Sequence, residues 1–326
     1  MIVNEMSSLR KASVAWEEIG EDAAGQRIDN FLLGLLKGVP KSHVYRILRS
    51  GEVRVNSGRV DATYRLRWGD RVRIPPVRRA QPVPSENAAP KKGAPLLEGR
   101  ILYEDDSLIA LDKPSGWAVH GGSGIQLGVI EQLRRERPQA KFLELVHRLD
   151  RDTSGVLLLA KKRSLLVGLH ARLKEGGIDK RYLVLAKGQF PDEKKVVRLP
   201  LHKFLTESGE RRVTVHREGK ESETVFYRKQ RFTEATLLEA RLLTGRTHQI
   251  RVHLAHSGYP VAGDEKYGDF PWNRQQAKQG LKRMFLHAAV LRFTHPLTDA
   301  PLVLESPLPD DLEAYLRHLS TPDHAL

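Results

Sequence analysis

A proline-rich stretch divides this chain of 326 residues into two unequal parts. Residues 76–97 contain five prolines and several alanines, and their apolar residues show little periodicity. Proline lacks the backbone N–H that helices and sheets use, and segments of this composition form extended linkers. The chain is therefore not expected to fold as one continuous unit. We expect a small domain before the stretch and a larger one after it.

The expected organisation has five parts. They are an N-terminal tail over 1–24, a small domain over 25–77, a flexible linker over 78–97, a larger domain over 98–318 and a C-terminal tail over 319–326. With 40% hydrophobic and 29% charged residues, the chain has enough apolar material to bury a sizeable core.

The positive charge of the chain is concentrated in the small domain. Lys and Arg outnumber Asp and Glu by 54 to 40, which gives a net charge of +14. Residues 25–79 hold thirteen Lys and Arg against four Asp and Glu, so +9 of that charge lies in one sixth of the chain. These basic residues interleave with a foldable apolar pattern and do not form a tail. A polyanion is therefore the first partner to expect, ahead of a membrane surface.

Two short helices and a hairpin are predicted within the small domain. Apolar residues recur at helical spacing over 28–36, and a second helix is expected to be capped by Ser42 and ended by Gly51. The letters NSG at 56–58, between alternating apolar and basic residues, indicate a hairpin. Such a unit with arginines on one face suits a phosphate backbone. The arginines expected to bind RNA are Arg46, Arg49, Arg54 and Arg59.

Strands joined by hairpins dominate the pattern of the larger domain. ILYEDDSLIALDKP predicts a hairpin that turns at Asp105 and Asp106, and VIEQLRRERP and SLLVGLHARLKEG predict helices. Further strands are predicted at VLLLAKK, RYLVLAKG, ETVFYRKQRF, TLLEARLLTG and HAAVLRFTHP. This order favours an α+β fold with a mixed, largely antiparallel sheet flanked by helices. Neither GxGxxG nor GxxxxGK[ST] occurs, so a nucleotide cofactor is not supported.

Two regions are dense in side chains that carry chemistry. One is HRLDRDTSG at 147–155, directly before a buried strand, and the other is TGRTHQIRVHLAHSGYPVAGDEKYG at 244–268. The second is expected to form a helix capped by Thr247, and its histidines lack HExxH spacing, which argues against a metal site. DRDTS nearly fits the phosphatase pattern DxDx[TV], although that pattern needs an apolar strand ending at the first Asp. On these residues alone a phosphatase or a non-catalytic RNA-binding, ribosome-associated protein remains an alternative.

Five motifs of the larger domain resemble those of the RluA/RluC family of pseudouridine synthases. In family order they are DKPSGWAVHGGSG at 112–124, HRLDRDTSG at 147–155, KRYLVLAKG at 180–188, TGRTHQIRVHLAHSGYPVAGDEKYG at 244–268 and FLHAAVLRFTHP at 285–296. The small domain resembles the alpha-L RNA-binding domain of the S-four type through GQRIDNFL, KSHVYRILRSGEVRVNSGRV and GDRVRIP. The resemblance implies a pseudouridine synthase fold preceded by an alpha-L domain.

The family resemblance also implies an activity, which is the isomerisation of specific uridines of large-subunit (23S) ribosomal RNA to pseudouridine. It makes Asp150 the catalytic carboxylate, acting as nucleophile or base, with Arg251 as its ion-pair partner. Tyr182 would stack on the uracil and take part in proton transfer, and Arg148 would fill the space left by the flipped-out nucleotide. The other implied substrate contacts are His147, Ile250 and Leu286.

Several expected absences follow from the residues and the resemblance. The chain has no cysteine, which excludes disulfides and a thiolate nucleophile. The N-terminus mixes both charges and lacks an apolar core, so we expect no signal peptide, and no apolar run is long enough for a membrane span. We therefore expect a cytoplasmic monomer that binds ribosomal RNA and needs neither a metal ion nor a cofactor.

Overall fold

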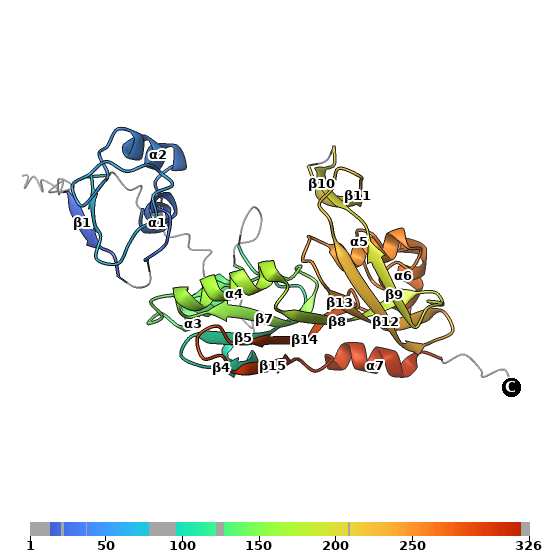
Figure 1. The fold of residues 1–326 in the computed structure, drawn as a ribbon. Helices are drawn as coiled ribbons and strands as arrows, with labels where there is room; N and C mark the ends of the chain where they lie inside the picture. Colours follow the sequence, from blue (N-terminus) through green and yellow to red (C-terminus); the bar gives the residue numbers. More distant parts are fainter. Residues whose placement is uncertain are drawn as a thin grey trace, which may run out of the picture. The chain divides into compact units, whose positions relative to one another are not determined.

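The computed structural model describes residues 14–20, 23–36, 38–77, 96–121, 127–207 and 209–320. The chain splits into two compact units, Met1–Ala94 and Pro95–Leu326 (Figure 1). Most of the predicted linker over 78–97 and parts of both predicted tails lie outside the described residues. Among the described residues, none of the helices combines the length and the apolar composition that crossing a membrane requires.

The first unit packs two helices against a three-stranded sheet. Its elements are β1 (Ala15–Glu18), α1 (Ile28–Leu35), α2 (Lys41–Arg49), β2 (Arg54–Val55) and β3 (Arg71–Ile74). The sheet has the order β1-β3-β2, and both of its pairings are antiparallel. Buried Leu32 and Ile47, one from each helix, share a core with Val72 of β3 because each helix is apolar along one face.

Two boundaries of the first unit differ from the sequence prediction. Strand β1 lies within the predicted tail over 1–24, yet it pairs with β3 and is followed by the buried Ile19. Helix α2 begins at Lys41 with Pro40 as its N-cap, so the prediction that Ser42 caps it is wrong. The extended backbone of proline suits the residue before a first turn. The turn at 56–58 is confirmed, since Asn56 and Ser57 both have a positive φ. The predicted hairpin is reduced to a single bridge between Val55 and Gly58, because β2 pairs with β3.

A ten-stranded sheet forms the framework of the second unit. Its strands are β4 (Ile101–Glu104), β5 (Leu108–Lys113), β6 (Glu144–Leu145), β7 (Ser154–Ala160), β8 (Asp179–Lys187), β9 (Lys194–Arg198), β12 (Glu223–Arg231), β13 (Ala235–Leu242), β14 (Leu286–Thr294) and β15 (Pro301–Glu305). The main path is β4-β5-β7-β14-β8-β13-β12-β9, with β15 beside β14 and β6 beside β7. Only β7 and β14 run parallel within it, so the predicted mixed, largely antiparallel sheet is confirmed.

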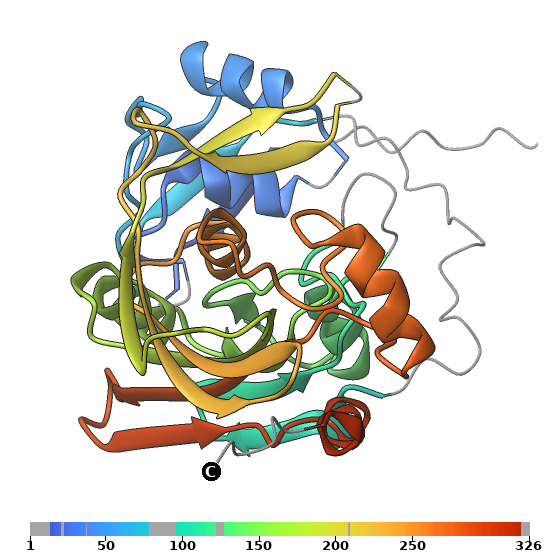
Figure 2. The same cartoon turned by 90° about the vertical axis from the view of Figure 1, so that its right-hand side faces the viewer.

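One hairpin and several helices complete the second unit. Strands β10 (Leu201–Leu205) and β11 (Arg211–Val215) form a separate two-stranded sheet and project from the large sheet in both views (Figures 1 and 2). The helical segments are η2 (Glu98–Arg100), α3 (Val129–Glu136), α4 (Arg163–Glu175), α5 (Gln249–His256), α6 (Phe270–Lys278) and α7 (Asp310–His318).

Separate cores cover the two faces of the large sheet. Side chains alternate between the faces along a strand, so Leu157 of β7 packs with α3 and α5, whereas its neighbour Leu158 packs with α4. Tyr182 of β8 belongs to the same core as Leu157. The predicted site tyrosine therefore lies on the face of the sheet that α5 covers.

Gly155 allows β7 and β14 to approach closely at the start of their parallel pairing. Its φ is +108°, and a Cβ atom there would lie 2.2 Å from the carbonyl oxygen of Ala288 on β14. No side chain fits in that space, so glycine is required for this contact. The contact brings Leu286, at the beginning of β14, to the loop that precedes β7.

We expect Gly155→Ala to destabilise the second unit by roughly 2–4 kcal/mol, because it adds backbone strain to a steric clash. Urea unfolding of the full chain measures the loss. Gly99→Ala is the control, since a Cβ atom at Gly99 meets nothing within 4 Å. Equal stabilities of the two variants would contradict this account of the contact.

Candidate active site

The loop between β6 and β7 carries the densest group of predicted site residues. Lys113, a fully buried lysine at the end of β5, is hydrogen-bonded to this loop. Its ammonium group donates to the carbonyl oxygens of Pro114 at 2.9 Å, Trp117 at 2.7 Å and Arg151 at 2.9 Å. The first and second sequence motifs are thereby tied together, which holds the backbone beside Asp150 in place.

Arg251 joins Asp150 to a second carboxylate that sequence reasoning did not single out. Its Nη1 donates to Oδ2 of Asp150 at 3.0 Å. Its Nε and Nη2 donate to the two oxygens of Asp264, each at 2.7 Å. The side chain of Asp264 is 0% exposed, that of Arg251 5% and that of Asp150 19%. Asp264 is therefore the buried anchor of the guanidinium, and Asp150 is the carboxylate that faces the pocket.

The charges of this network are mutually stabilised. Burial raises the pKa of Asp264, but hydrogen bonds and charge from Arg251 outweigh it and hold that pKa below the usual range. Burial likewise opposes the charged form of Arg251, yet Asp264 and then Asp150 raise the pKa of the guanidinium above its ordinary value. A permanent cation thus lies against Asp150, and its own charge is already balanced by Asp264.

The turn before α5 is anchored differently from the predicted Thr247 cap. The helix begins at Gln249, and His248 before it has a left-handed backbone with φ +54° and no side-chain cap. Oε1 of Gln249 accepts from the Arg246 N–H and the Thr244 hydroxyl, both at 2.9 Å. The Gln249 amide donates in turn to strand β12. These contacts fix the start of α5, so the prediction of a Thr247 cap is wrong.

Tyr182 lies on β8 between two small residues of the neighbouring strands. Ala240 of β13 and Ala288 of β14 stand opposite it in register, so its ring has space beside it. The residue is 8% exposed. Burial, together with the charge of Asp150, raises the pKa of Tyr182, so the hydroxyl keeps its proton at neutral pH.

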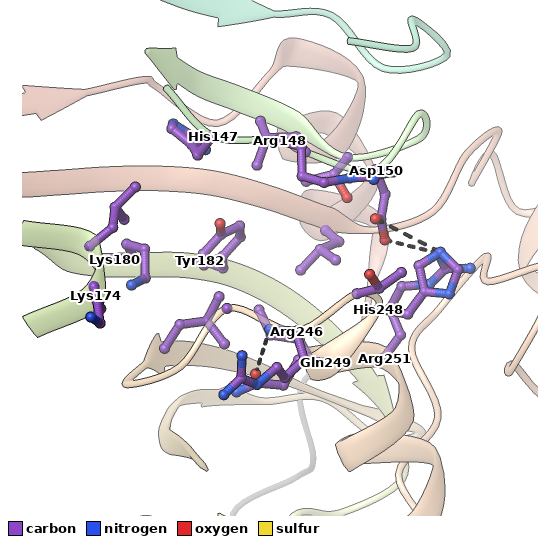
Figure 3. A pocket seen from close by; sticks show the side chains of 18 residues that line it. His147, Arg148, Asp150, Lys174, Lys180, Tyr182, Arg246, His248, Gln249 and Arg251 are labelled. Carbon is purple, nitrogen blue, oxygen red and sulfur yellow. Dashed lines mark hydrogen bonds and ion pairs between the residues drawn. The ribbon is translucent and has the colours of Figure 1, made fainter. Parts of the chain in front are cut away.

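All seven residues predicted for the catalytic and substrate-binding site line one cavity of about 410 Å³ (Figure 3). Besides Asp150, Tyr182 and Arg251 they are His147, Arg148, Ile250 and Leu286. Burial and the charge of Lys180 lower the pKa of His147 to about 4, and its Nε2 accepts from the Leu158 N–H at 3.1 Å. His147 is therefore neutral and holds the loop against β7. Arg148 is exposed.

Three further cations line the cavity and were not among the predicted site residues: Lys174, Lys180 and Arg246. Figure 3 shows Lys174 and Lys180 at the opposite end from Asp150, with Tyr182 between. Lys180 is 8% exposed, and burial lowers its pKa. Lys180 comes two residues before Tyr182 on the same strand, so both side chains point to the same face of the sheet. This spacing is the signal that could have revealed Lys180. The pocket thus has a carboxylate at one end and cations at the other.

The remaining predicted residues lie elsewhere. Arg46, Arg49, Arg54 and Arg59 are exposed residues of the first unit. Within the described ranges, no group of three or more His, Cys, Asp or Glu side chains is arranged to hold a metal ion. His253 hydrogen-bonds the Ser222 hydroxyl at 2.8 Å, and His248 faces Tyr267 and Asp150.

Each of the two units matches a known protein family. Residues 107–256 match the family model described as RNA pseudouridylate synthase, and residues 26–72 match that of the S4 domain. Ribosomal large subunit pseudouridine synthase C of Escherichia coli (strain K12) is 54% identical over 309 residues, which cover 94% of this chain and 97% of that protein. The protein of the same name from Yersinia pestis is 55% identical over 294 residues, covering 90% and 92%.

Solved structures agree with this similarity. The structure of human RNA Pseudouridylate Synthase Domain Containing 4 superposes with a TM-score of 0.56 at 26% identity and covers 70% of this chain and 96% of that one. Human RNA Pseudouridylate Synthase Domain Containing 1 gives a TM-score of 0.54 at 26% identity, covering 68% and 96%.

We expect Asp264→Asn to cost about 3–5 kcal/mol of unfolding free energy, because it leaves the buried Arg251 without its anchoring charge. Asp150→Asn serves as the matched control in the same network and should cost about 1 kcal/mol or less, since Asp150 is partly exposed. Denaturant unfolding of both variants decides the matter. A smaller loss for Asp264→Asn than for Asp150→Asn would show that the anchor has been misassigned.

Proposed function

Because the chain belongs to the RluA/RluC family of RNA pseudouridine synthases, we propose that it isomerises specific uridines of large-subunit ribosomal RNA to pseudouridine. The observation that carries this proposal is the Asp150–Arg251 ion pair at one end of a pocket that also contains Tyr182. The reaction breaks the bond from N1 of uracil to C1′ of ribose and forms a bond from C5 to C1′. One proton leaves C5 and one is gained at N1, so the product is an isomer of the substrate.

Asp150 is proposed to act on the nucleotide as nucleophile or base. Arg251 holds the carboxylate in place through the hydrogen bond from its Nη1 to Oδ2 of Asp150 as water is displaced from the pocket. Tyr182 is proposed to stack on the uracil. Its raised pKa leaves almost none of the basic phenolate form in the free enzyme at neutral pH, which favours the packing role over the removal of a proton.

The target uridine has to leave its stack in the RNA before it reaches Asp150, which costs a few kcal/mol. Arg148 is exposed beside the cavity, and its planar guanidinium suits stacking in the vacated space. Ile250 and Leu286 are proposed as apolar walls around the base. The cations at the end of the pocket opposite Asp150 favour a negatively charged ligand, and RNA carries such charges on its phosphates.

The first unit is proposed as the RNA anchor. Its S4 domain match and its exposed arginines support binding to the phosphate backbone, which positions a protein without selecting a base. We further propose that the protein works as a cytoplasmic monomer, without a metal ion or a cofactor. The isomerisation is redox-neutral and transfers no external group, so it needs no co-reactant.

Asp150→Asn should abolish pseudouridine formation in ribosomal RNA while RNA affinity changes little, because the substitution removes the carboxylate and keeps its shape. Mapping of pseudouridines after incubation with RNA measures this. Asp152→Asn is the matched control, since this neighbouring carboxylate pairs with Arg151 near the surface and should leave the rate near that of the wild type.

Turnover by Asp150→Asn near the wild-type rate would defeat the assignment. A metal-dependent phosphatase, by contrast, would lose activity in EDTA and with either aspartate variant. The isomerase is expected to keep its rate in EDTA.

Replacing Arg46, Arg49, Arg54 and Arg59 together by Gln should weaken RNA binding and lower its salt dependence. If each arginine neutralises one phosphate, the slope of log K against log[salt] falls by roughly 3. Binding titrations at several salt concentrations measure the slope. An equal charge removed from exposed Arg274, Lys278, Lys282 and Arg317 of the second unit controls for net charge. The same slope change in both variants would refute a dedicated anchor.

A further inference from the structure

The backbone of His248 is strained at the edge of the pocket. Of the described residues, four other than glycine have a positive φ, namely Asn56, Ser57, His248 and Asp299. The other three are exposed turn residues, whereas His248 lines the catalytic cavity. A left-handed backbone is unfavourable for a residue with a side chain and persists where the surroundings enforce it. The strain calls for an explanation from the contacts of this imidazole.

Tyr267 determines which nitrogen of His248 carries the proton. Its hydroxyl oxygen accepts from the Val213 N–H at 2.9 Å and lies 2.8 Å from Nδ1 of His248. Burial raises the pKa of Tyr267, so the hydroxyl keeps its proton. In the described part of the chain, Nδ1 is the one acceptor paired with that hydroxyl. With Tyr267 as the donor to Nδ1, the proton of the neutral imidazole sits on Nε2, and this is the tautomer on which the proposal below is built.

Nε2 of His248 faces the catalytic carboxylate at a distance of 3.8 Å from Oδ1 of Asp150. Oδ2, the other oxygen, accepts from Arg251 at 3.0 Å. A single donor on one oxygen leaves the carboxylate free to rotate about its last torsion. A second donor on the other oxygen restricts that rotation. Figure 3 shows both side chains on the same side of Asp150.

We propose that His248 is a positioning residue for Asp150, with its N–H aimed at Oδ1 by the Tyr267 hydroxyl. The inference rests on the proposed function, because it assigns a role within the same reaction. The present gap exceeds hydrogen-bonding distance and closes when substrate fills the pocket, as catalytic hydrogen bonds often tighten on binding. The Tyr267 ring also packs on Arg251, 5.1 Å from its guanidinium carbon, so it supports both partners of Asp150.

This chain of contacts reaches the projecting hairpin. Val213, whose N–H fixes the Tyr267 hydroxyl, lies in β11. The path from the hairpin to the catalytic carboxylate therefore runs through Val213, Tyr267, His248 and Asp150. Substitution of Tyr267 by Phe removes the hydroxyl and breaks that path, and it replaces none of the residues that line the pocket.

The test compares Tyr267→Phe, His248→Asn and the double variant in single-turnover reactions on ribosomal RNA. Asparagine is chosen because it tolerates the left-handed backbone. Tyr267→Phe should lower the maximal rate about tenfold and His248→Asn about a hundredfold, since small misplacements of a reacting group are costly. RNA concentrations at half-saturation should stay within about twofold of the wild type. The double variant should match His248→Asn, because Tyr267 acts through His248.

Tyr103→Phe is the matched control. It deletes a tyrosine hydroxyl that donates to the carboxylate of Asp105 at 2.9 Å. Neither residue lines the pocket, so this variant should keep the wild-type rate. Multiplicative losses in the double variant, an unchanged rate for Tyr267→Phe or an equal loss for Tyr103→Phe would each overturn the proposal.

A measurement independent of activity uses ¹⁵N chemical shifts of the histidine rings in the full chain. The signal lost in His248→Asn should be that of a neutral ring protonated at Nε2, and a proton on Nδ1 would overturn the inference. If His248→Asn does not fold, the Tyr267→Phe spectrum identifies the same ring by its shift. A wild-type protein that forms no pseudouridine would refute the proposed function instead, while the ring shifts still test the hydrogen-bond chain.

Discussion

The placement of Arg251 between two carboxylates is the interaction on which the rest of the site depends. Asp264 is wholly buried and fixes the guanidinium with two hydrogen bonds, so the third donor points to Asp150 without freedom to turn away. If Asp150 were the single carboxylate bound to Arg251, the two charges would cancel. Asp264 already balances the guanidinium, so the group of Arg251, Asp264 and Asp150 keeps a net negative charge, which leaves Asp150 available for chemistry.

Local periodicity predicted much of the framework. The helices α1 and α4 and the hairpin of β4 and β5 appear where spacing and turn residues placed them, because each is decided by neighbours in the sequence. The prediction of a mixed, largely antiparallel sheet was also correct. Strand β1 was missed, since its four residues AWEE carry too little signal, and its partner β3 is more than fifty residues away.

The site was predicted only where the resemblance supplied it. Asp150 and Arg251 are 101 positions apart, and nothing in local spacing joins them. Asp264 and Tyr267 were visible as letters of a long motif, but their contacts depend on how the chain folds back after α5. The left-handed backbone of His248 was equally hidden, because no pattern of neighbouring residues in the sequence marks it.

The position of β14 in the sheet has a consequence for how this protein is made. This strand, close to the end of the chain, is inserted between β7 and β8, and it is the element that unites the Asp150 loop with the Tyr182 strand. Contacts so distant in sequence form slowly. Residues 286–294 therefore have to be synthesised before the two halves of the sheet can be joined in this order, so the pocket is completed late in the synthesis of the chain.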